Sequence, residues 1–530
     1  MNYVSWEFLV FLAISIIVYF AAPDKVKWCV LLIASYVFYL FSGLDNLIFI
    51  LTSTCVTFFG GLWLGKLHET EKSAVFEGED AAQQKKQFKA AMKKKRNRVT
   101  ALVLVINLGI LVFLKYYNFA ASTADTILGM LGLRKFIPEL DLLLPLGISF
   151  YTFQSSGYVI DVCKGKYEPD RNIFKFALFV SFFPQIVQGP IGRYDDLAHQ
   201  LYAPHKPEYR RCKFGFQLLI WGYFQKLVIA DRLMLLCITV FDNYTQFAGF
   251  EFIVASLLYG IQLYCDFAGG VNVCRGAAEI FGITMAENFE QPFFATTLSD
   301  FWRRWHMSLG NWMKDYLFYP LAMSKPVKKM ARKASQKHGL AFGALVPNCI
   351  PSLVVFFIIG IWHGASWAYV AFGLYNGGLI ALSVLLTPVF SKMNTALKIN
   401  TERFSWRMWQ MVRTLFLITI SRILVRPAGL KEAWYILKSI FTTFNPWILF
   451  DGSLFEMGLD KLNFGVAAVA TLVLTVVGVL HENGWHLRER LHEQGIVFRW
   501  FIMLCAILSV LILGSYGPAF IATEFIYQAF

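Results

Sequence analysis

The chain has 530 residues, of which 57% are hydrophobic and only 16% are charged, and its mean hydropathy is +0.51. A soluble domain carries roughly 25% charged residues, so the composition excludes an ordinary soluble protein and indicates a membrane protein. The net charge of +14 does not indicate a nucleic-acid-binding protein. Residues 66–98 hold ten Lys/Arg against five Asp/Glu, and residues 325–337 hold six against none, so two short segments beside apolar runs carry most of the excess. This is the positive-inside pattern of cytosolic loops.

Apolar runs recur along the whole chain, and a membrane-spanning helix needs about 20 mostly apolar residues. Because some runs are short or broken, we expect about 11 spans, with several re-entrant or horizontal pieces among them. The first run is not a cleaved signal peptide, since it has no basic start and contains Glu7. With 66–98 in the cytosol, counting back three spans predicts an N-terminus outside. The runs are 4–22, 28–43, 46–64, 99–114, 142–163, 173–188, 214–240, 250–265, 352–371, 373–390, 408–424, 464–480 and 498–515.

We predict one all-α transmembrane domain over residues 1–530, in three parts. Residues 1–135 form the N-terminal spans, and the polar, helix-prone segment 65–98 forms an exposed cytosolic hairpin. Residues 136–390 form a middle region with many interruptions, and residues 391–530 form plainer spans. The nine cysteines have no CxxC spacing and lie mostly in apolar runs, so neither a disulfide framework nor a metal site is expected.

Four polar or Gly/Pro-containing stretches interrupt the apolar runs of the middle region. Each one alone could be a simple kink or a structural contact, such as an arginine partner for Asp266. Polar groups and broken helices persist at membrane depth only where they line a cavity or pack on protein. Four together favour a shared polar cavity. The stretches are LPLGISFYTFQ (144–154), FFPQIVQGPIGR (182–193), YCDFAGG (264–270) and ENFEQPF (287–293).

Residues 302–317 carry an unusual number of charges for an apolar chain. At 100° per residue they predict one amphipathic helix, with tryptophans on one face and charges on the other. Such a helix can lie along the membrane interface, and a plain surface anchor is the simpler interpretation. His306, however, falls at the edge of the apolar face, near Met313 and Leu317, which directs a titratable group into the protein.

His363 follows an apolar run in the stretch FFIIGIWHGASW (356–367). An ionisable residue in an apolar run indicates a functional site, although it can also be a buried structural donor. Desolvation lowers the pKa of an imidazole and keeps it neutral, which suits a general base. The other histidines lie in polar loops or at span ends, where we expect them to be solvated.

The segment DFWRRWHMSLGNWMKDYLFYPL (300–321), followed about 40 residues later by GIWHGASW (360–367), resembles the paired-histidine signature of the membrane-bound O-acyltransferase family. The chain is most similar to the bacterial branch with the alginate and peptidoglycan O-acetyltransferases, and more distantly to the teichoic-acid D-alanylation protein. The four interrupting stretches match that branch in the same order, so the resemblance covers residues 1–390 strongly and the rest more weakly. Many relatives have Asp at Asn272 and His at Asn376, so a charge at those two places is not expected here.

The resemblance implies a helical bundle around a transmembrane tunnel. It makes His363 the catalytic histidine and His306 the second active-site histidine, both lining that tunnel, with the 302–317 segment at its cytosolic mouth. The stretch EFIYQAF (524–530) resembles the F-x-Y-x-x-F motif of the small partner protein of D-alanylation, in which a tyrosine is proposed to carry the acyl group. Tyr527 is therefore a candidate acyl carrier, although the stretch could also be the plain end of a span.

These observations predict an O-acetyltransferase that passes acetyl from a cytosolic thioester, acetyl-CoA being the expected donor, to an extracytoplasmic polysaccharide. We expect a bacterial cytoplasmic-membrane location, an SGNH-type extracytoplasmic partner, contacts with membrane lipids, and no bound cofactor. The candidate substrate-binding residues are Arg303, Arg304, Trp305, Asn311 and Trp362. The alternatives are D-alanyl or other acyl transfer, a transporter of a lipid-linked sugar, and a scaffold for other cell-envelope enzymes.

Overall fold

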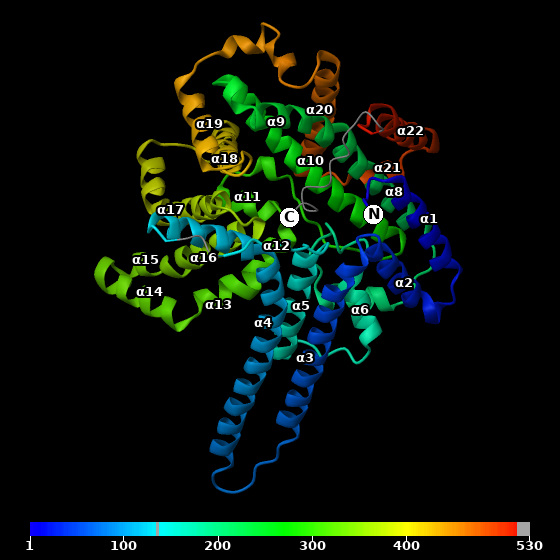
Figure 1. The fold of residues 1–530 in the computed structure, drawn as a ribbon, viewed down its shortest axis with the longest axis vertical. Coiled ribbons are helices and arrows are strands. Elements are labelled where there is room, and N and C mark those ends of the chain that lie inside the picture. The colour runs from blue at the N-terminus through cyan, green and yellow to red at the C-terminus, as the bar shows by residue number, and fades with distance from the viewer. Residues whose placement is uncertain (134–136, 517–530) are drawn as a thin grey trace. The chain divides into compact units, whose positions relative to one another are not determined.

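The computed structural model describes residues 1–133 and 137–516 (Figure 1). Within them the chain is helical and contains no β-strand beyond a single bridge between Phe289 and Trp305. Its contacts divide it into two compact units. Unit 1 comprises Met1–Phe216 and Cys274–Ala286, and unit 2 comprises Gln217–Val273 and Glu287–Phe530. The single transmembrane domain over 1–530 stays a prediction.

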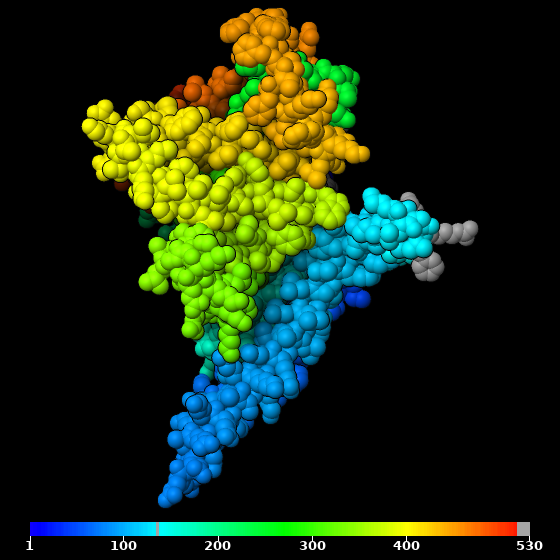
Figure 2. All heavy atoms as spheres, turned by 90° about the vertical axis from the view of Figure 1, so that its left-hand side faces the viewer, coloured from blue at the N-terminus to red at the C-terminus, as the bar shows by residue number. Residues whose placement is uncertain are grey.

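Unit 1 is built around a long helical hairpin that projects beyond its other helices (Figures 1 and 2). In the apolar half of the hairpin the Asn107 amide donates to Thr57 Oγ1 over 3.0 Å, and Gly60 lies against Val103. The charged half corresponds to residues 65–98, which form the predicted hairpin from the end of α3, a short connection over residues 74–80 and the start of α4. The helices of unit 1 are α1 (Trp6–Ala21), α2 (Lys27–Leu40), α3 (Leu47–Ser73), α4 (Ala81–Met130), α5 (Ile148–Lys164), α6 (Ile173–Ser181) and α7 (Tyr194–Tyr202).

Unit 2 holds the remaining helices, and α8 (Tyr209–Tyr223) and α10 (Phe250–Ile280) each contribute residues to both units. The basic segment 325–337, expected as a loop, is a helix, because Ser324 caps its first turn by accepting the Val327 N–H. The others are α9 (Asp231–Asp242), α11 (Leu298–Arg304), α12 (Met307–Met313), α13 (Tyr319–Ala322), α14 (Lys325–His338), α15 (Leu340–Gly343), α16 (Val346–His363), α17 (Trp367–Ala396), α18 (Phe404–Ile423), α19 (Leu430–Thr442), α20 (Lys461–Glu482), α21 (Leu487–Glu493) and α22 (Ile496–Leu513).

Seven helices of the described chain are long and apolar enough to cross a membrane, fewer than the roughly 11 expected from the runs. Several of the other runs form single helices that are shorter than a span, such as the 16 residues of α1, and others are interrupted. The run 173–188 forms only the nine residues of α6 before the backbone leaves the helix at Phe182. The run 214–240 lies in one continuous helical stretch, residues 209–242, whose middle, Phe224–Ala230, is π-helical. The prediction of an all-α, multi-pass membrane protein is confirmed.

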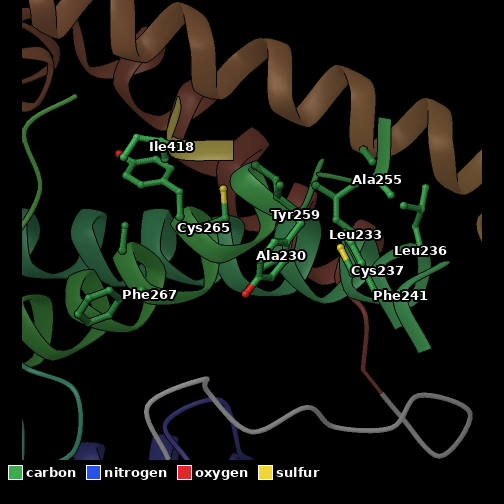
Figure 3. Close-up of a cluster of buried hydrophobic side chains, with 14 of the residues drawn as sticks. Ala230, Leu233, Leu236, Cys237, Phe241, Ala255, Tyr259, Cys265, Phe267 and Ile418 are labelled. Atoms are coloured by element: carbon green, nitrogen blue, oxygen red, sulfur yellow. The ribbon is translucent and has the colours of Figure 1, made fainter. Parts of the chain in front are cut away.

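The core of unit 2 joins the π-helical segment, α9, α10 and α18. Figure 3 shows Leu233 and Leu236 of α9 near Ala255 and Tyr259 of α10, with Ile418 of α18 in the same cluster. A charged group lies inside this apolar packing. The ammonium of Lys226, fully buried in the π-helical segment, lies 2.6 Å from an oxygen of Asp266 and 2.8 Å from an oxygen of Asp231. These ion pairs tie the π-helical segment to α10.

Helices α16 and α17 approach closely at two glycines. A Cβ at Gly373 would lie 2.5 Å from the Phe356 carbonyl oxygen, and one at Gly360 would lie 2.4 Å from the Tyr369 carbonyl oxygen. Small residues at a helix crossing let two backbones meet in this way. The close crossing sets the position of His363, which is the last residue of α16.

We predict that Gly373→Ala lowers the stability of the protein, because the added methyl group meets backbone atoms that cannot move aside. Overpacking of this kind is worth about 1–3 kcal/mol. Gly378→Ala is the matched control on the same helix, since a Cβ there meets nothing within 4 Å. Thermal unfolding of the detergent-solubilised variants measures both, and equal melting temperatures would contradict the close crossing.

Candidate active site

The helix predicted over residues 302–317 is interrupted, which corrects that prediction. Helix α11 ends at Arg304 and α12 begins at Met307, and His306 between them has a left-handed backbone with φ of 49°. A non-glycine residue rarely adopts this conformation, and such residues cluster at functional sites. Helical periodicity therefore does not describe the direction of the His306 side chain.

The stretch ENFEQPF holds this break open. The Met307 N–H donates to the Asn288 backbone carbonyl over 2.9 Å, and the Glu290 N–H donates to the Arg304 carbonyl over 3.0 Å. The side-chain oxygen of Asn288 accepts the Ser308 N–H at 3.0 Å and lies 3.2 Å from His306 Nδ1. Since that oxygen is an acceptor, His306 carries its proton on Nδ1, and Nε2 keeps the lone pair of the neutral ring.

His306 lies in aromatic surroundings and is only 3% exposed. The edge of the Phe267 ring meets it with a centroid distance of 4.7 Å, and the Trp362 ring lies at 6.2 Å. Burial, together with the nearby His363, lowers the pKa of His306 well below its usual value. Because the charged form is disfavoured, His306 stays neutral around neutral pH.

His363 ends α16 and is half-buried. Its ring lies 4.7 Å from Trp362, 6.3 Å from Tyr369 and 5.9 Å from Phe372, measured between centroids. Gly364 makes room for this arrangement, because a Cβ there would lie 2.1 Å from the Tyr369 ring. Trp362 contacts both imidazoles, so the structure brings the two predicted histidines to one place.

His363 lines a cavity of about 70 Å³ inside unit 2, with space for a few water-sized groups. His306 is not part of its wall but contacts Phe267, which is. The predicted tunnel past both histidines stays a prediction. Figure 3 shows three of the lining residues, Tyr259, Phe267 and Ile418. The full lining is Tyr259, Leu263, Phe267, Phe301, Trp302, Trp305, His363, Tyr369, Phe372, Ile418, Ser421, Arg422 and Val425.

The predicted substrate-binding residues divide into two groups. Trp305 lines the cavity and Trp362 contacts both histidines. Arg303 and Asn311 are on the surface, away from this cavity. Arg304 forms a two-pronged ion pair with Glu482, with N–O distances of 2.7 and 3.2 Å, and a further pair with Asp300. Its charge therefore fastens α11 to α20.

Asn376 and Asn272 are the two neutral residues at positions where many members of the family that the sequence resembles have an ionisable side chain. The Asn376 amide donates to Ser421 Oγ at 2.7 Å, and its oxygen accepts from Trp302 Nε1 at 3.3 Å. The Asn272 amide donates to Gln225 at 2.8 Å. Both are thus hydrogen-bonded as neutral groups. Tyr527 lies outside the described residues.

Sequence reasoning missed Arg422 and the role of Asn288. Arg422 lines the same cavity as His363, and the signal was available, because Arg422 is an ionisable residue in the apolar run 408–424. Asn288 lies in a stretch that was singled out, but only the structure shows which side chain it holds. Among the described residues no three His, Cys, Asp or Glu side chains gather as a metal site.

Residues 169–425, which include both histidines, match the model of the membrane-bound O-acyltransferase family. The chain carries a membrane-bound O-acyltransferase domain. It is 28% identical over 473 residues to the probable alginate O-acetylase AlgI of Azotobacter vinelandii, covering 88% of this chain and 83% of that protein. To the peptidoglycan O-acetyltransferase of Helicobacter pylori it is 28% identical over 439 residues, covering 77% and 73%.

A third relative is the teichoic acid D-alanyltransferase of Bacillus subtilis, which is 29% identical over 249 residues, with 46% of this chain and 60% of that protein covered. These matches confirm the predicted family and the predicted O-acyltransferase activity. They do not test the roles of individual residues, which rest on the geometry above.

We predict that Asn288→Ala slows acyl transfer by roughly tenfold or more, a part of the 10²–10⁴-fold that acid–base or orienting groups contribute. The reason is that both the tautomer and the direction of His306 depend on the Asn288 oxygen. Kinetics of Asn288→Ala, His306→Ala and the double variant provide the measurement. The double variant should be no slower than His306→Ala, and multiplied losses would show that Asn288 acts elsewhere.

Proposed function

We propose that this protein is a membrane O-acetyltransferase that passes acetyl from a cytosolic thioester, acetyl-CoA, to a hydroxyl group of an extracytoplasmic polysaccharide. The observation that carries the proposal is His363 on a small aromatic cavity, with a second buried imidazole in contact through Trp362. The names of the two O-acetylating relatives support the acyl group and the class of acceptor.

The chemistry needs a base, a means to polarise the thioester carbonyl, and dry surroundings. In the proposed reaction a hydroxyl oxygen, that of the carrier Tyr527 or of the polysaccharide itself, attacks the thioester carbon while His363 takes the hydroxyl proton. The carbon–sulfur bond then breaks, and the proton passes to the departing sulfur, which leaves as a thiol. His306, neutral and held by Asn288, orients the aromatic groups around His363. Aromatic walls exclude the water that would hydrolyse the thioester.

The membrane topology is part of the same proposal. The charged ends of α3 and α4 and the basic helix α14 are assigned to the cytosolic side by the positive-inside rule, which puts the N-terminus outside. Basic helices on that side would attract an anionic donor by long-range steering. The cytoplasmic membrane as location and an SGNH-type extracytoplasmic partner belong to the proposal as well.

We predict that His363→Gln abolishes acetyl transfer while the protein keeps its membrane insertion and melting temperature. The glutamine preserves a hydrogen-bonding group but cannot accept the hydroxyl proton. His338→Gln is the matched control, since His338 is exposed at the end of α14. Transfer from labelled acetyl-CoA to polysaccharide in membranes measures both variants. Wild-type transfer by a stably inserted His363→Gln protein would remove His363 from the mechanism.

Tyr527 is proposed as an acyl carrier on the evidence of the F-x-Y-x-x-F stretch alone. A covalent acyl-tyrosine intermediate would divide the transfer of the acyl group across about 30 Å of hydrocarbon into two shorter steps. We predict that Tyr527→Phe stops transfer to polysaccharide while donor binding survives. Peptide mass spectrometry of the wild-type protein without acceptor should then find acetyl on Tyr527. Full activity of Tyr527→Phe would instead favour direct transfer across His363.

A further inference from the structure

Arg422 carries a charge that no other described residue neutralises. It is the second-last residue of α18 and is only 4% exposed. Both terminal nitrogens of its guanidinium group, Nη1 and Nη2, are buried without a hydrogen-bond partner among the described residues. A guanidinium group does not lose its proton in a protein, so the cation persists in a buried site.

Aromatic rings surround this cation. Its Cζ lies 5.5 Å from the centroid of Phe293, 5.7 Å from that of Phe301 and 5.3 Å from that of Trp305. Ring faces attract a cation, but they leave its N–H donors unused. Gly260 leaves the space that the group fills, because a Cβ there would lie 2.3 Å from Nη1. The protein thus holds a guanidinium group in place without satisfying it.

Three other cations of unit 2 each have a carboxylate partner. Arg426, four residues along, also lies over aromatic rings but has an ion pair with Asp242 at 3.1 Å. Lys226 has two carboxylate partners, and Arg304 has two as well. An uncompensated buried charge destabilises a protein strongly. The unpaired charge of Arg422 has a function if an anion forms beside it during the reaction and interacts with its guanidinium group.

The place of that anion follows from the cavity. Arg422 and His363 line the same space, which is large enough to hold an acetyl group. Ser421, bonded to the buried amide of Asn376, fixes the rotation of α18 and hence the place of Arg422. The one negative charge that arises on an acetyl group during transfer is the oxygen of the tetrahedral intermediate.

We propose that Arg422 is a catalytic residue that donates N–H bonds to the thioester carbonyl oxygen and stabilises the oxyanion. The inference rests on the proposed acetyl transfer. As the acceptor oxygen bonds to the carbonyl carbon, its proton goes to His363 and the carbonyl π-electron pair moves onto the oxygen beside Arg422. When the carbonyl re-forms, the carbon–sulfur bond breaks and the sulfur takes the proton from His363. No further reactant is needed.

The test compares Arg422→Gln, Arg422→Lys and Arg422→Met in the full-length membrane protein, with Arg426→Gln as the matched control. Loss of one oxyanion-stabilising group typically lowers kcat by about 10²–10³-fold. We expect that loss for the Gln and Met variants, with KM for acetyl-CoA changed only a few-fold, and partial recovery for the Lys variant. Arg426→Gln should keep kcat within a few-fold of the wild type.

Thermal unfolding separates this role from a structural one. Replacing an unpaired buried charge by methionine should leave the melting temperature unchanged or raise it, while a purely structural arginine would lower it. A raised KM with unchanged kcat would mean that Arg422 binds a permanent anion of the donor, and would overturn the proposal. Unchanged kcat and KM in all Arg422 variants would also overturn it. If the wild-type protein itself transfers no acetyl group, the proposed function fails and this inference with it.

Discussion

The oxygen of the Asn288 side chain is the acceptor on which the arrangement of the candidate site depends. It receives the Ser308 N–H at the start of α12 and lies against Nδ1 of His306. With both donors satisfied, the backbone can leave the helix at His306 and resume it at Met307. Without that acceptor, we would expect α11 and α12 to form one continuous amphipathic helix, because the periodicity of the sequence favours it. The break therefore depends on a loop that precedes α11 in the chain, and it determines where the imidazole points.

A second constraint is the treatment of charge inside an apolar chain. Lys226 and Arg304 each have two carboxylate partners, so their ion pairs act as fasteners between helices. Asn272 and Asn376 are bonded as neutral amides. Against this background, Arg422 and the two histidines are the polar groups of the site whose surroundings are mainly aromatic. A low-dielectric enclosure strengthens the interaction of such groups with any charge that develops there. The same aromatic side chains can therefore keep water away from the thioester and strengthen the electrostatic stabilisation of the reaction.

Much of this could be predicted from sequence, for identifiable reasons. The helical class follows from long apolar runs, and His363 was found because an imidazole in such a run is rare. Fewer helices reach the length of a span than the apolar runs predicted, in part because runs such as 173–188 are apolar without being helical throughout. The direction of His306 was out of reach, since it depends on a left-handed residue and on a hydrogen bond to Asn288, 18 positions away. The role of Arg304 was equally hidden, because a sequence does not show that Glu482 lies beside α11.

Selection of the acyl group and selection of the polysaccharide depend on different parts of the protein. The walls of the cavity, formed by side chains such as Leu263, Phe372 and Ile418, surround the space beside His363, where the proposed reaction places the transferred acyl group. One additional methylene in a tight apolar pocket changes discrimination by about 1–3 kcal/mol, so the choice of acyl length belongs to these residues. Under the proposed function, a polymer is too large to lie wholly beside His363, so surfaces outside the cavity must also recognise it, and the acyltransferase chemistry can stay the same while the polymer differs among relatives.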